Sequence, residues 1–466
     1  MGEELWSKSA TALAALIECG DVSSREVIDA HLERIASVNA HVNAVVEVLA
    51  DSARKEADEA DRLQKQGAPL GPLHGVPFSI KTNIDVKDGA TTEGCVALKD
   101  LVAPSDAPIV EKMRGAGAVA LARTNMPDLG LRINTESSLY GAAHNPWDLT
   151  RTVGGSSGGE AAAIATGMSP LGLGNDIGGS LRNPAYCCGI ASIKPSFGRV
   201  AQGNESSLID PGLNSQLMLV QGVLARSVAD VRLGFESIMG AHRRDPHAID
   251  APLVGPGAKK RVALVPEPEG GATDPGVAAG VRAAGRALEE AGYVVEEISP
   301  PMLTEAYLSW SELMWTSLAV VGPLLESVMG DGGRAFLDFT SVEYPPRTPE
   351  SEYLLHTQRY KVAKAFQSFL ADYPVMVGPT WTQPPFPLGF DIASKENAWQ
   401  VVEMFRFVLP ANLLGLPAAC VPTGLSTGLP TGVQVISARF REDLCLDAAQ
   451  SIEDILGTLT PIDPRV

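Results

Sequence analysis

The stretch that decides the fold is Thr152–Pro195, TVGGSSGGEAAAIATGMSPLGLGNDIGGSLRNPAYCCGIASIKP. Its glycine- and serine-rich beginning, residues 154–159, runs directly into the helix-forming residues 160–164. A glycine loop at the start of a helix leaves backbone N–H groups free to bind whatever lies beside it. The stretch therefore predicts a site built on main-chain donors.

Three interpretations of this loop compete. A phosphate-binding loop is excluded because its lysine is missing, and the glycines of residues 172–178 have the wrong last spacing for a dinucleotide fingerprint. The third interpretation is a serine nucleophile, because residues 154–158 read Gly-x-Ser-x-Gly, the elbow of α/β-hydrolases. An esterase that uses Ser156 would also need a later acid and a histidine near the C-terminus. The available histidines, none in a convincing context, are His242, His247 and His356.

A second serine, Ser180, follows two glycines in residues 176–180. Glycines at these positions leave backbone N–H groups unobstructed, and an oxyanion hole needs such donors about 3 Å from the developing charge. A tight turn is the plain alternative for a Gly-Gly-Ser sequence. Two serines flanked by glycines nevertheless predict nucleophilic chemistry when a base is also available.

Lys81 is the candidate base. Residues 75–80 alternate in polarity like a strand, so Lys81 should lie at a strand end near the core. Desolvation disfavours the ammonium form and can keep a buried lysine neutral. A solvated surface position is the usual fate of a lone lysine, but the apolar run before Lys81 argues against it here.

Strand and helix patterns alternate along the chain, which predicts an α/β layered fold with a mixed sheet. Residues 1–66 are expected to be helical, with a capping box formed by Ser23 and Glu26. Residues 261–265, 274–291 and 293–298 read as a strand–helix–strand unit. Further expected helices are 50–66, 107–115, 402–414 and 442–456, and further expected strands are 117–123, 417–422 and 432–437.

No linker separates independent units, so we expect one domain over residues 1–466. Within it, 1–66 would form N-terminal helices, 67–245 the catalytic core, 300–400 a variable helical cap and 401–466 a return to the core.

Composition limits the possible partners. The 466 residues carry a net charge of −18, which argues against binding nucleic acid or an anionic membrane surface. No apolar run approaches the ~20 residues that a membrane-spanning helix needs. Glu3 and Glu4 stand where a signal peptide would carry positive charge. The 6 cysteines form no Cys-x-x-Cys and the 7 histidines show no metal-ligand spacing, so we expect a cytoplasmic protein with reduced thiols and no metal.

Taken together, these motifs resemble the amidase signature family of serine hydrolases. The order and spacing hold along nearly the whole chain, and only the region of about 250–400 is weakly matched. The matching segments are GPLHGVP (71–77), KTN (81–83), TNMP (124–127), NPWD (145–148), GGSSGG (154–159), DIGGSLRNP (176–184), KP (194–195), PAN (410–412), GLP (415–417) and GLPTGVQ (428–434).

The resemblance implies a Ser–cis-Ser–Lys triad. Ser180 would be the nucleophile, Lys81 the base, and Ser156 the bridging serine that follows a cis peptide bond from Gly155. The family fold would be an open mixed sheet between helices, with a helical cap and with no metal or organic cofactor.

Further roles follow from the same resemblance. The N–H groups of Ile177, Gly178, Gly179 and Ser180 would hold the oxyanion. Asp176 and Arg182 would form a supporting ion pair, and Ser157 would orient the loop that carries Ser156.

The family hydrolyses C–N bonds of amides, and the loop over residues 127–134 lines the acyl side of its pocket. Here that loop carries Leu129, Gly130 and Leu131, so we expect an apolar pocket for an aryl or alkyl group. Gln400 and the turn at Ala142–Ala143 are further candidates for substrate contact. Aromatic residues of the cap are expected at the pocket, with the cap's own core as the alternative for each: Trp310, Trp315, Tyr344, Phe386, Phe390 and Trp399.

Two branches of the family are compared. The glutamine-dependent amidotransferase of the same family is the alternative, and the acidic charge and the apolar loop argue against it. The chain is more similar to metagenomic urethanases, which cleave small carbamates. We therefore expect a small amide or carbamate substrate and a monomer or homodimer. A non-catalytic binding protein is the remaining class, and the presence of all the triad residues argues against it.

Overall fold

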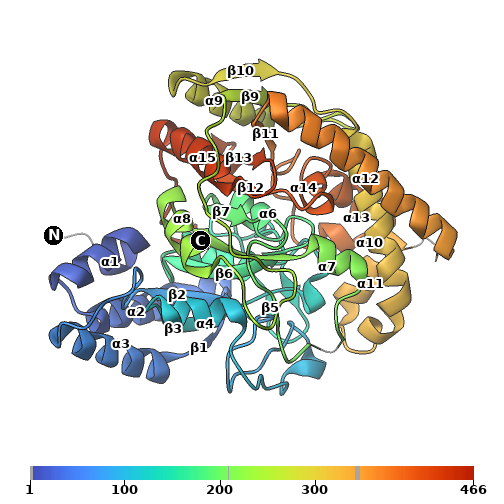
Figure 1. The fold of residues 1–466 in the computed structure, drawn as a ribbon. Helices are drawn as coiled ribbons and strands as arrows, with labels where there is room; N and C mark the ends of the chain where they lie inside the picture. Colours follow the sequence, from blue (N-terminus) through green and yellow to red (C-terminus); the bar gives the residue numbers. More distant parts are fainter. Residues whose placement is uncertain (1–3, 208, 342–346, 466) are drawn as a thin grey trace.

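The computed structural model describes residues 4–207, 209–341 and 347–465, and an 11-stranded mixed sheet runs through them (Figure 1). The strand order is β1-β3-β2-β6-β8-β7-β12-β13-β11-β9-β10. The strands are β1 (Val45–Val48), β2 (Pro77–Lys81), β3 (Val119–Thr124), β6 (Leu171–Asp176), β7 (Ala191–Lys194), β8 (Val220–Ala225), β9 (Arg261–Leu264), β10 (Val294–Glu297), β11 (Val375–Pro379), β12 (Ala418–Ser426) and β13 (Leu429–Ser437). β4 (Glu136–Ser137) and β5 (Gly141–Ala142) pair separately.

Helices cover both faces of the sheet, as the alternating pattern predicts. Apolar residues of α4, α8 and α15 pack on one face, and those of α5, α6 and α14 pack on the other. The helices are α1 (Ala10–Cys19), α2 (Ser24–Val42), α3 (Ala50–Lys65), α4 (Pro108–Gly115), α5 (Gly158–Ala165), α6 (Arg182–Cys188), α7 (Leu213–Met218), α8 (Val228–Ile238), α9 (Pro275–Glu290), α10 (Leu303–Glu326), α11 (Asp331–Ser341), α12 (Pro349–Asp372), α13 (Lys395–Glu403), α14 (Leu409–Leu413) and α15 (Glu442–Leu456).

The N-terminal region is mostly helical, but it also contributes a strand. The capping box of Ser23 and Glu26 is present at the start of α2. The expectation of helices alone over 1–66 is wrong, because β1 pairs antiparallel with β3 at the sheet edge. Asn43 ends α2 in a left-handed conformation and redirects the chain into that strand. A strand this short is defined by its partner, which the local sequence pattern does not contain.

The segment expected as a helical cap also differs from the expectation in one place. α10, α11 and α12 gather at one side of the molecule (Figure 1), and α10 packs against α14. However, β11 lies between β13 and β9 in the central sheet and is buried throughout. The domain bounds given above remain a prediction.

A turn interrupts the helix expected over 402–414. α13 ends at Glu403 and α14 begins at Leu409. Pro410 stands in the first turn of α14, where its missing N–H costs nothing. The intervening turn brings Phe405 and Val408 close to Gly179, so it forms part of the site described below.

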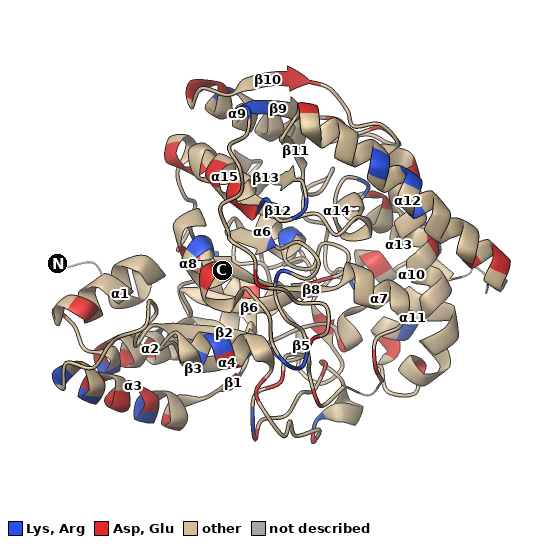
Figure 2. Ribbon diagram, in the orientation of Figure 1, with Lys and Arg blue, Asp and Glu red and all other residues tan. Residues whose placement is uncertain are grey.

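Charges are interleaved on the outer helices. Figure 2 shows acidic and basic residues alternating along α3, at the edge of the molecule. Within the described ranges, no helix combines the length and apolar character needed to cross a bilayer.

Candidate active site

The residues expected to form the triad, together with Asp176, come together at one edge of the sheet. Lys81 ends β2 and Asp176 ends β6. These strands are parallel neighbours, with Ile80 opposite Leu173, so their carboxyl ends meet at the same edge. Ser156 precedes α5 and Ser180 precedes α6, which places both serines in turns at helix starts beside that edge.

Lys81 is fully buried and hydrogen-bonded at this edge. Its exposed fraction is 0%. Its Nζ donates to Ser156 Oγ at 2.7 Å and to Asn175 Oδ1 at 2.8 Å. Burial lowers the pKa of Lys81 from 10.5 to about 7, although the carboxyl groups of Glu93, Asp176 and Glu160 oppose this shift. Burial at this position thus favours the neutral amine, which is the form of a lysine that can accept a proton.

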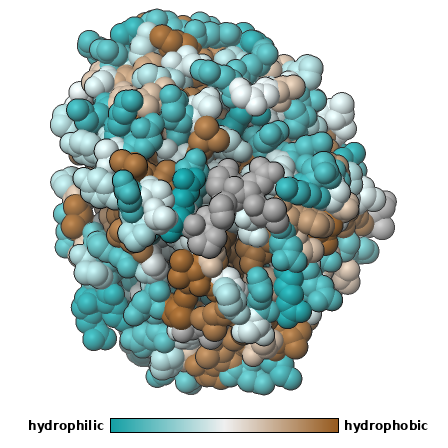
Figure 3. All heavy atoms as spheres, turned by 90° about the vertical axis from the view of Figure 1, so that its right-hand side faces the viewer, coloured by the Kyte–Doolittle hydropathy of each residue, from teal (hydrophilic) through white to brown (hydrophobic). Residues whose placement is uncertain are grey.

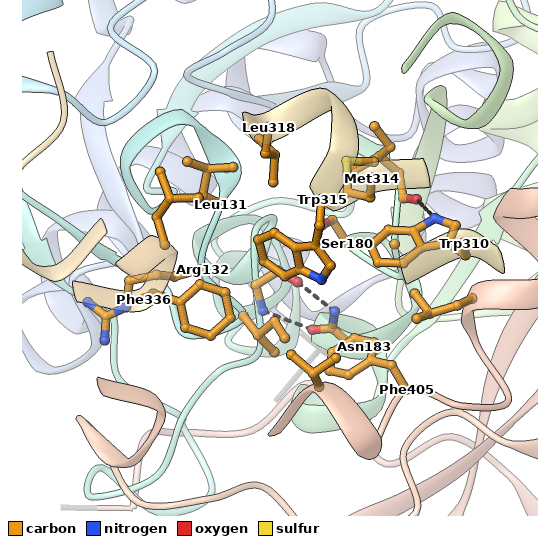
Figure 4. Close-up of a pocket in the computed structure, with 18 residues that line it drawn as sticks. Leu131, Arg132, Ser180, Asn183, Trp310, Met314, Trp315, Leu318, Phe336 and Phe405 are labelled. Carbon is orange, nitrogen blue, oxygen red and sulfur yellow. Dashed lines mark hydrogen bonds between the residues drawn. The ribbon is translucent and has the colours of Figure 1, made fainter. Parts of the chain in front are cut away.

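The loop of Ser156 is held by a reciprocal pair of hydrogen bonds. The Gly155–Ser156 peptide bond is cis. The N–H of Gly155 donates to Asn183 Oδ1 at 2.9 Å, and Asn183 Nδ2 donates back to the carbonyl oxygen of Gly155 at 2.6 Å (Figure 4). A Cβ at Gly155 would lie 2.7 Å from the backbone of Ile133, so only glycine fits there. Sequence reasoning missed Asn183, although it lies within the motif that carries Ser180.

Asn175 is a second residue of this site that the sequence alone did not indicate. Its Oδ1 accepts the hydrogen bond from Lys81, and its Nδ2 donates to Asn83 Oδ1 at 3.0 Å. The side-chain amide is thereby fixed with its oxygen toward the lysine. The only available signal was its place just before Asp176 at the end of a strand.

The turn that carries Ser180 is built on the carboxylate of Asp176. This carboxylate accepts hydrogen bonds from the N–H of Gly179 at 2.7 Å and of Leu181 at 3.2 Å. The Gly179 N–H is thus already used, which corrects its expected role as an oxyanion donor. In the described part of the chain, no residue accepts a backbone hydrogen bond from Ile177, Gly178 or Ser180, so those donors remain available.

Asp176 and Arg182 form the expected ion pair. Both side chains are fully buried and their charged atoms lie 3.0 Å apart. Burial acts to raise the pKa of Asp176, but the Arg182 guanidinium and the Asn412 amide hold it well below its usual value. Arg182 also donates to the carbonyl oxygen of Val408 at 2.9 Å and to Gln434 at 2.7 Å. The ion pair therefore connects the Ser180 turn to the turn before α14 and to β13, which come from the C-terminal part of the chain.

Ser157 joins the two serine loops through its main chain. Its N–H donates to the carbonyl oxygen of Ser180 at 3.3 Å. Its buried hydroxyl has no hydrogen-bond partner among the described residues. A Cβ at Gly174 would lie 2.8 Å from that hydroxyl, so the glycine makes room for Ser157 on β6.

Two cavities meet at Ser180. The inner cavity has a volume of about 90 Å³ and the outer cavity about 490 Å³. Figure 4 shows four aromatic side chains of the inner cavity gathered around Ser180. They are Trp310, Trp315, Phe336 and Phe405. Ser156 and Asn175 line the outer cavity and are absent from the lining of the inner one.

The residues expected to contact substrate divide between the two cavities. Gly130 and Leu131 line both, and Leu129 lines the outer cavity. Gln400 is exposed on α13 and lines neither cavity, so the structure does not bring it to the site. The turn at Ala142–Ala143 also lies outside both linings.

The aromatic residues of the cap fall into three groups. Trp310 and Trp315 line the inner cavity. Phe386 belongs to the buried hydrophobic core, and Phe390 and Trp399 are partly buried and pack against it. Tyr344 lies outside the described residues. Phe405, Phe336 and Met314 line the inner cavity without having been singled out. They come from the turn after α13, from α11 and from α10, and the local sequence does not show that these segments meet at one site.

Neither a metal site nor a histidine base is apparent beside the two serines. Within the described ranges, no group of three or more potential ligands could hold a metal ion. His242, His247 and His356 line neither cavity. The group hydrogen-bonded to Ser156 Oγ is Lys81, which disfavours an esterase of the α/β-hydrolase type.

Known proteins resemble this chain over nearly its whole length. A family model described as amidase matches residues 26–446. Indoleacetamide hydrolase from Bradyrhizobium diazoefficiens is 40% identical, with 98% of this chain and 88% of that protein covered. Acylamidase from Rhodococcus erythropolis is 33% identical, with coverages of 96% and 95%. The solved structure of 6-aminohexanoate cyclic dimer hydrolase with substrate has a TM-score of 0.86 at 28% identity, covering 99% of each chain.

Proposed function

Because the chain belongs to the amidase signature family, whose members hydrolyse the C–N bonds of amides, we propose that Lys81, Ser156 and Ser180 form its catalytic triad. We further propose that small aryl or alkyl amides and carbamates are its substrates. The observation that carries the proposal is the 2.7 Å hydrogen bond between a fully buried lysine and Ser156 Oγ.

The first half of the reaction forms an acyl-enzyme. Neutral Lys81 accepts the proton of Ser156, which accepts the proton of Ser180, and Ser180 Oγ attacks the carbonyl carbon. The free N–H groups of Ile177, Gly178 and Ser180 donate to the oxyanion. The turn that carries these amides is held by the Asp176 carboxylate through the N–H groups of Gly179 and Leu181, so it is in place before the substrate binds.

The second half releases the products. Protons return along the same path, and Ser156 protonates the leaving nitrogen as the C–N bond breaks. Water then attacks the acyl-enzyme. An amide gives an amine and a carboxylic acid. A carbamate gives an amine and an alkoxycarbonyl enzyme, and hydrolysis of that enzyme yields an alcohol and carbon dioxide.

The linings of the two cavities indicate how the substrate is oriented when it binds. The leaving nitrogen must face Ser156, because that serine returns the proton. Ser156 lines the outer cavity and not the inner one, so the amine portion belongs in the outer cavity. The acyl or alkoxycarbonyl portion then enters the aromatic inner cavity, whose size of about 90 Å³ suits a small apolar group.

The lining of the inner cavity disfavours the amidotransferase alternative. Glutamine carries charged groups that need partners. Among the described residues of the inner lining, Arg132 alone is charged, and it is already bound to Asp391 at 2.9 Å and to Glu136 at 2.8 Å. An apolar acyl or alkoxy group requires no such partner.

The test measures amine release from a matched pair, an N-aryl amide and the corresponding N-aryl alkyl carbamate. We expect the wild type to cleave both and Ser180→Ala to cleave neither. Ser192→Ala is the control, because it removes a buried, unpartnered hydroxyl that lines neither cavity. Cleavage of the amide alone would remove the carbamate part of the proposal. If Ser180→Ala released amine as fast as the wild type, the assignment of the triad would be wrong.

A further inference from the structure

The described side chains that line the outer cavity include two carboxylates. The charged residues that line it in the described part of the chain are Glu93 and Glu352, and no described lysine or arginine belongs to this lining. Glu93 shares this lining with Ser156, Asn175 and Ser180. A carboxylate therefore stands in the same cavity as the atoms proposed to react.

Glu93 is fixed in place but its carboxylate is not satisfied by the protein. Its carbonyl oxygen accepts a hydrogen bond from the N–H of Leu129 at 2.8 Å, and its backbone is left-handed with φ 49°. No described residue forms a hydrogen bond or ion pair with the carboxylate; its influence on Lys81 acts through space. Burial raises the pKa of Glu93 to about 7, and the charge of Lys81 opposes this rise. A half-buried carboxylate that lines a cavity and has no hydrogen-bonding partner among the described residues can accept a hydrogen bond from a cationic ligand.

The proposed orientation of the bound substrate determines which portion of it lies near Glu93. The leaving nitrogen faces Ser156 in the outer cavity, so the amine portion of the substrate lies in the cavity that Glu93 also lines. We propose that the outer cavity selects amides and carbamates whose amine portion carries a second, positively charged nitrogen, and that Glu93 accepts a hydrogen bond from that ammonium group. This inference rests on the proposed function, because it uses the direction assigned there.

The rim of the same cavity indicates what joins the two nitrogens. Its lining includes Ile209, Leu213 and Val320, which are 41%, 56% and 76% exposed. On the face shown in Figure 3, hydrophilic residues predominate and hydrophobic residues are most frequent in the lower half. An alkyl or aryl linker fits such surroundings better than a polar one. The substrate class is thus the monoacylated diamine with an apolar linker.

A competing role for Glu93 is purely electrostatic. The carboxyl groups that act on Lys81 are those of Glu93, Asp176 and Glu160. If Glu93 served only to tune the lysine, its removal would affect every substrate equally. Recognition of an ammonium group would instead change the preference between a charged and a neutral substrate.

The experiment measures binding rather than turnover. In the Ser180→Ala background, calorimetry compares the phenylacetyl monoamide of butanediamine with the phenylacetyl amide of pentylamine, which replaces the ammonium by a methyl group. We expect the charged ligand to bind about tenfold or more tightly than the neutral one, as for a charge-assisted hydrogen bond. Glu93→Gln should bring the two dissociation constants to within about twofold of each other, since a neutral amide cannot pair with the ammonium group.

Glu352→Gln is the matched control, because it removes the same charge from the same cavity. It should keep most of the preference. Equal binding of the two ligands before mutation, or an equal preference with Glu93 and with Gln, would overturn the inference. Hydrolysis of the neutral amide by the wild type is measured alongside. Failure of that hydrolysis would overturn the proposed function, whereas hydrolysis without a preference for the charged ligand would overturn the inference alone.

Discussion

Replacing Lys81 by methionine should abolish hydrolysis and at the same time stabilise the protein. The fall in the pKa of Lys81 from 10.5 to about 7 corresponds to about 5 kcal/mol of folding free energy, at about 1.4 kcal/mol for each pKa unit. Methionine avoids this cost but loses the hydrogen bonds to Ser156 and Asn175, worth about 1 kcal/mol each. The net gain in the free energy of unfolding is therefore about 3 kcal/mol at pH 7 or below.

The sign of the pH dependence follows from linkage. The pKa of Lys81 is lower in the folded protein than in the unfolded chain, so the unfolded chain binds more protons between about pH 7 and 10.5. Wild-type stability therefore rises with pH over that window, and the advantage of Lys81→Met shrinks to near zero by about pH 9.5.

Urea unfolding of both proteins at pH 7 and at pH 9.5 measures this difference. Lys99→Met, at an exposed position, serves as the control and should show no such pH-dependent gain. A Lys81→Met protein that is less stable than the wild type at pH 7, or an advantage that does not change with pH, would refute the conclusion that Lys81 is held neutral by burial.

Three further predictions concern the same site. Below pH 7, kcat/KM should fall about tenfold per pH unit as Lys81 gains its proton, and Lys81→Arg, which stays protonated, should be inactive in the same assay at every pH. Gly178→Ala would place a Cβ 2.7 Å from Trp310 in the inner cavity, so kcat/KM should fall about tenfold or more while the circular dichroism spectrum is retained. Arg182→Met leaves a buried carboxylate unpaired and should lower the free energy of unfolding in urea by about 3–5 kcal/mol, against about 0–1 kcal/mol for Arg232→Met at a partly exposed ion pair.

Local patterns in the sequence account for the position of the candidate base and its strand. The alternation before Lys81 predicts a strand that ends at the lysine, and β2 ends there. The capping box of Ser23 and Glu26 is equally local, since both residues lie within one helical turn. Such features need no knowledge of the rest of the chain.

Features that depend on distant residues could not be predicted. β11 becomes a strand because it pairs with β9 and β13, which come from separate parts of the chain. Asn175 and Asn183 acquire their roles only when the loops of Lys81 and Gly155 meet them. The N–H of Gly179 was expected to face the substrate, but the Asp176 carboxylate accepts its hydrogen bond.

The covalent intermediate tests the central claim most directly. A slowly hydrolysed carbamate is mixed with the protein, the reaction is quenched during turnover, and the modified residue is located by mass spectrometry of the peptides. The triad predicts that the alkoxycarbonyl group is carried by Ser180 and that Ser180→Ala remains unmodified. An alkoxycarbonyl group on Ser156, or turnover with Ser180 unmodified, would contradict the assignment of Ser180 as the nucleophile.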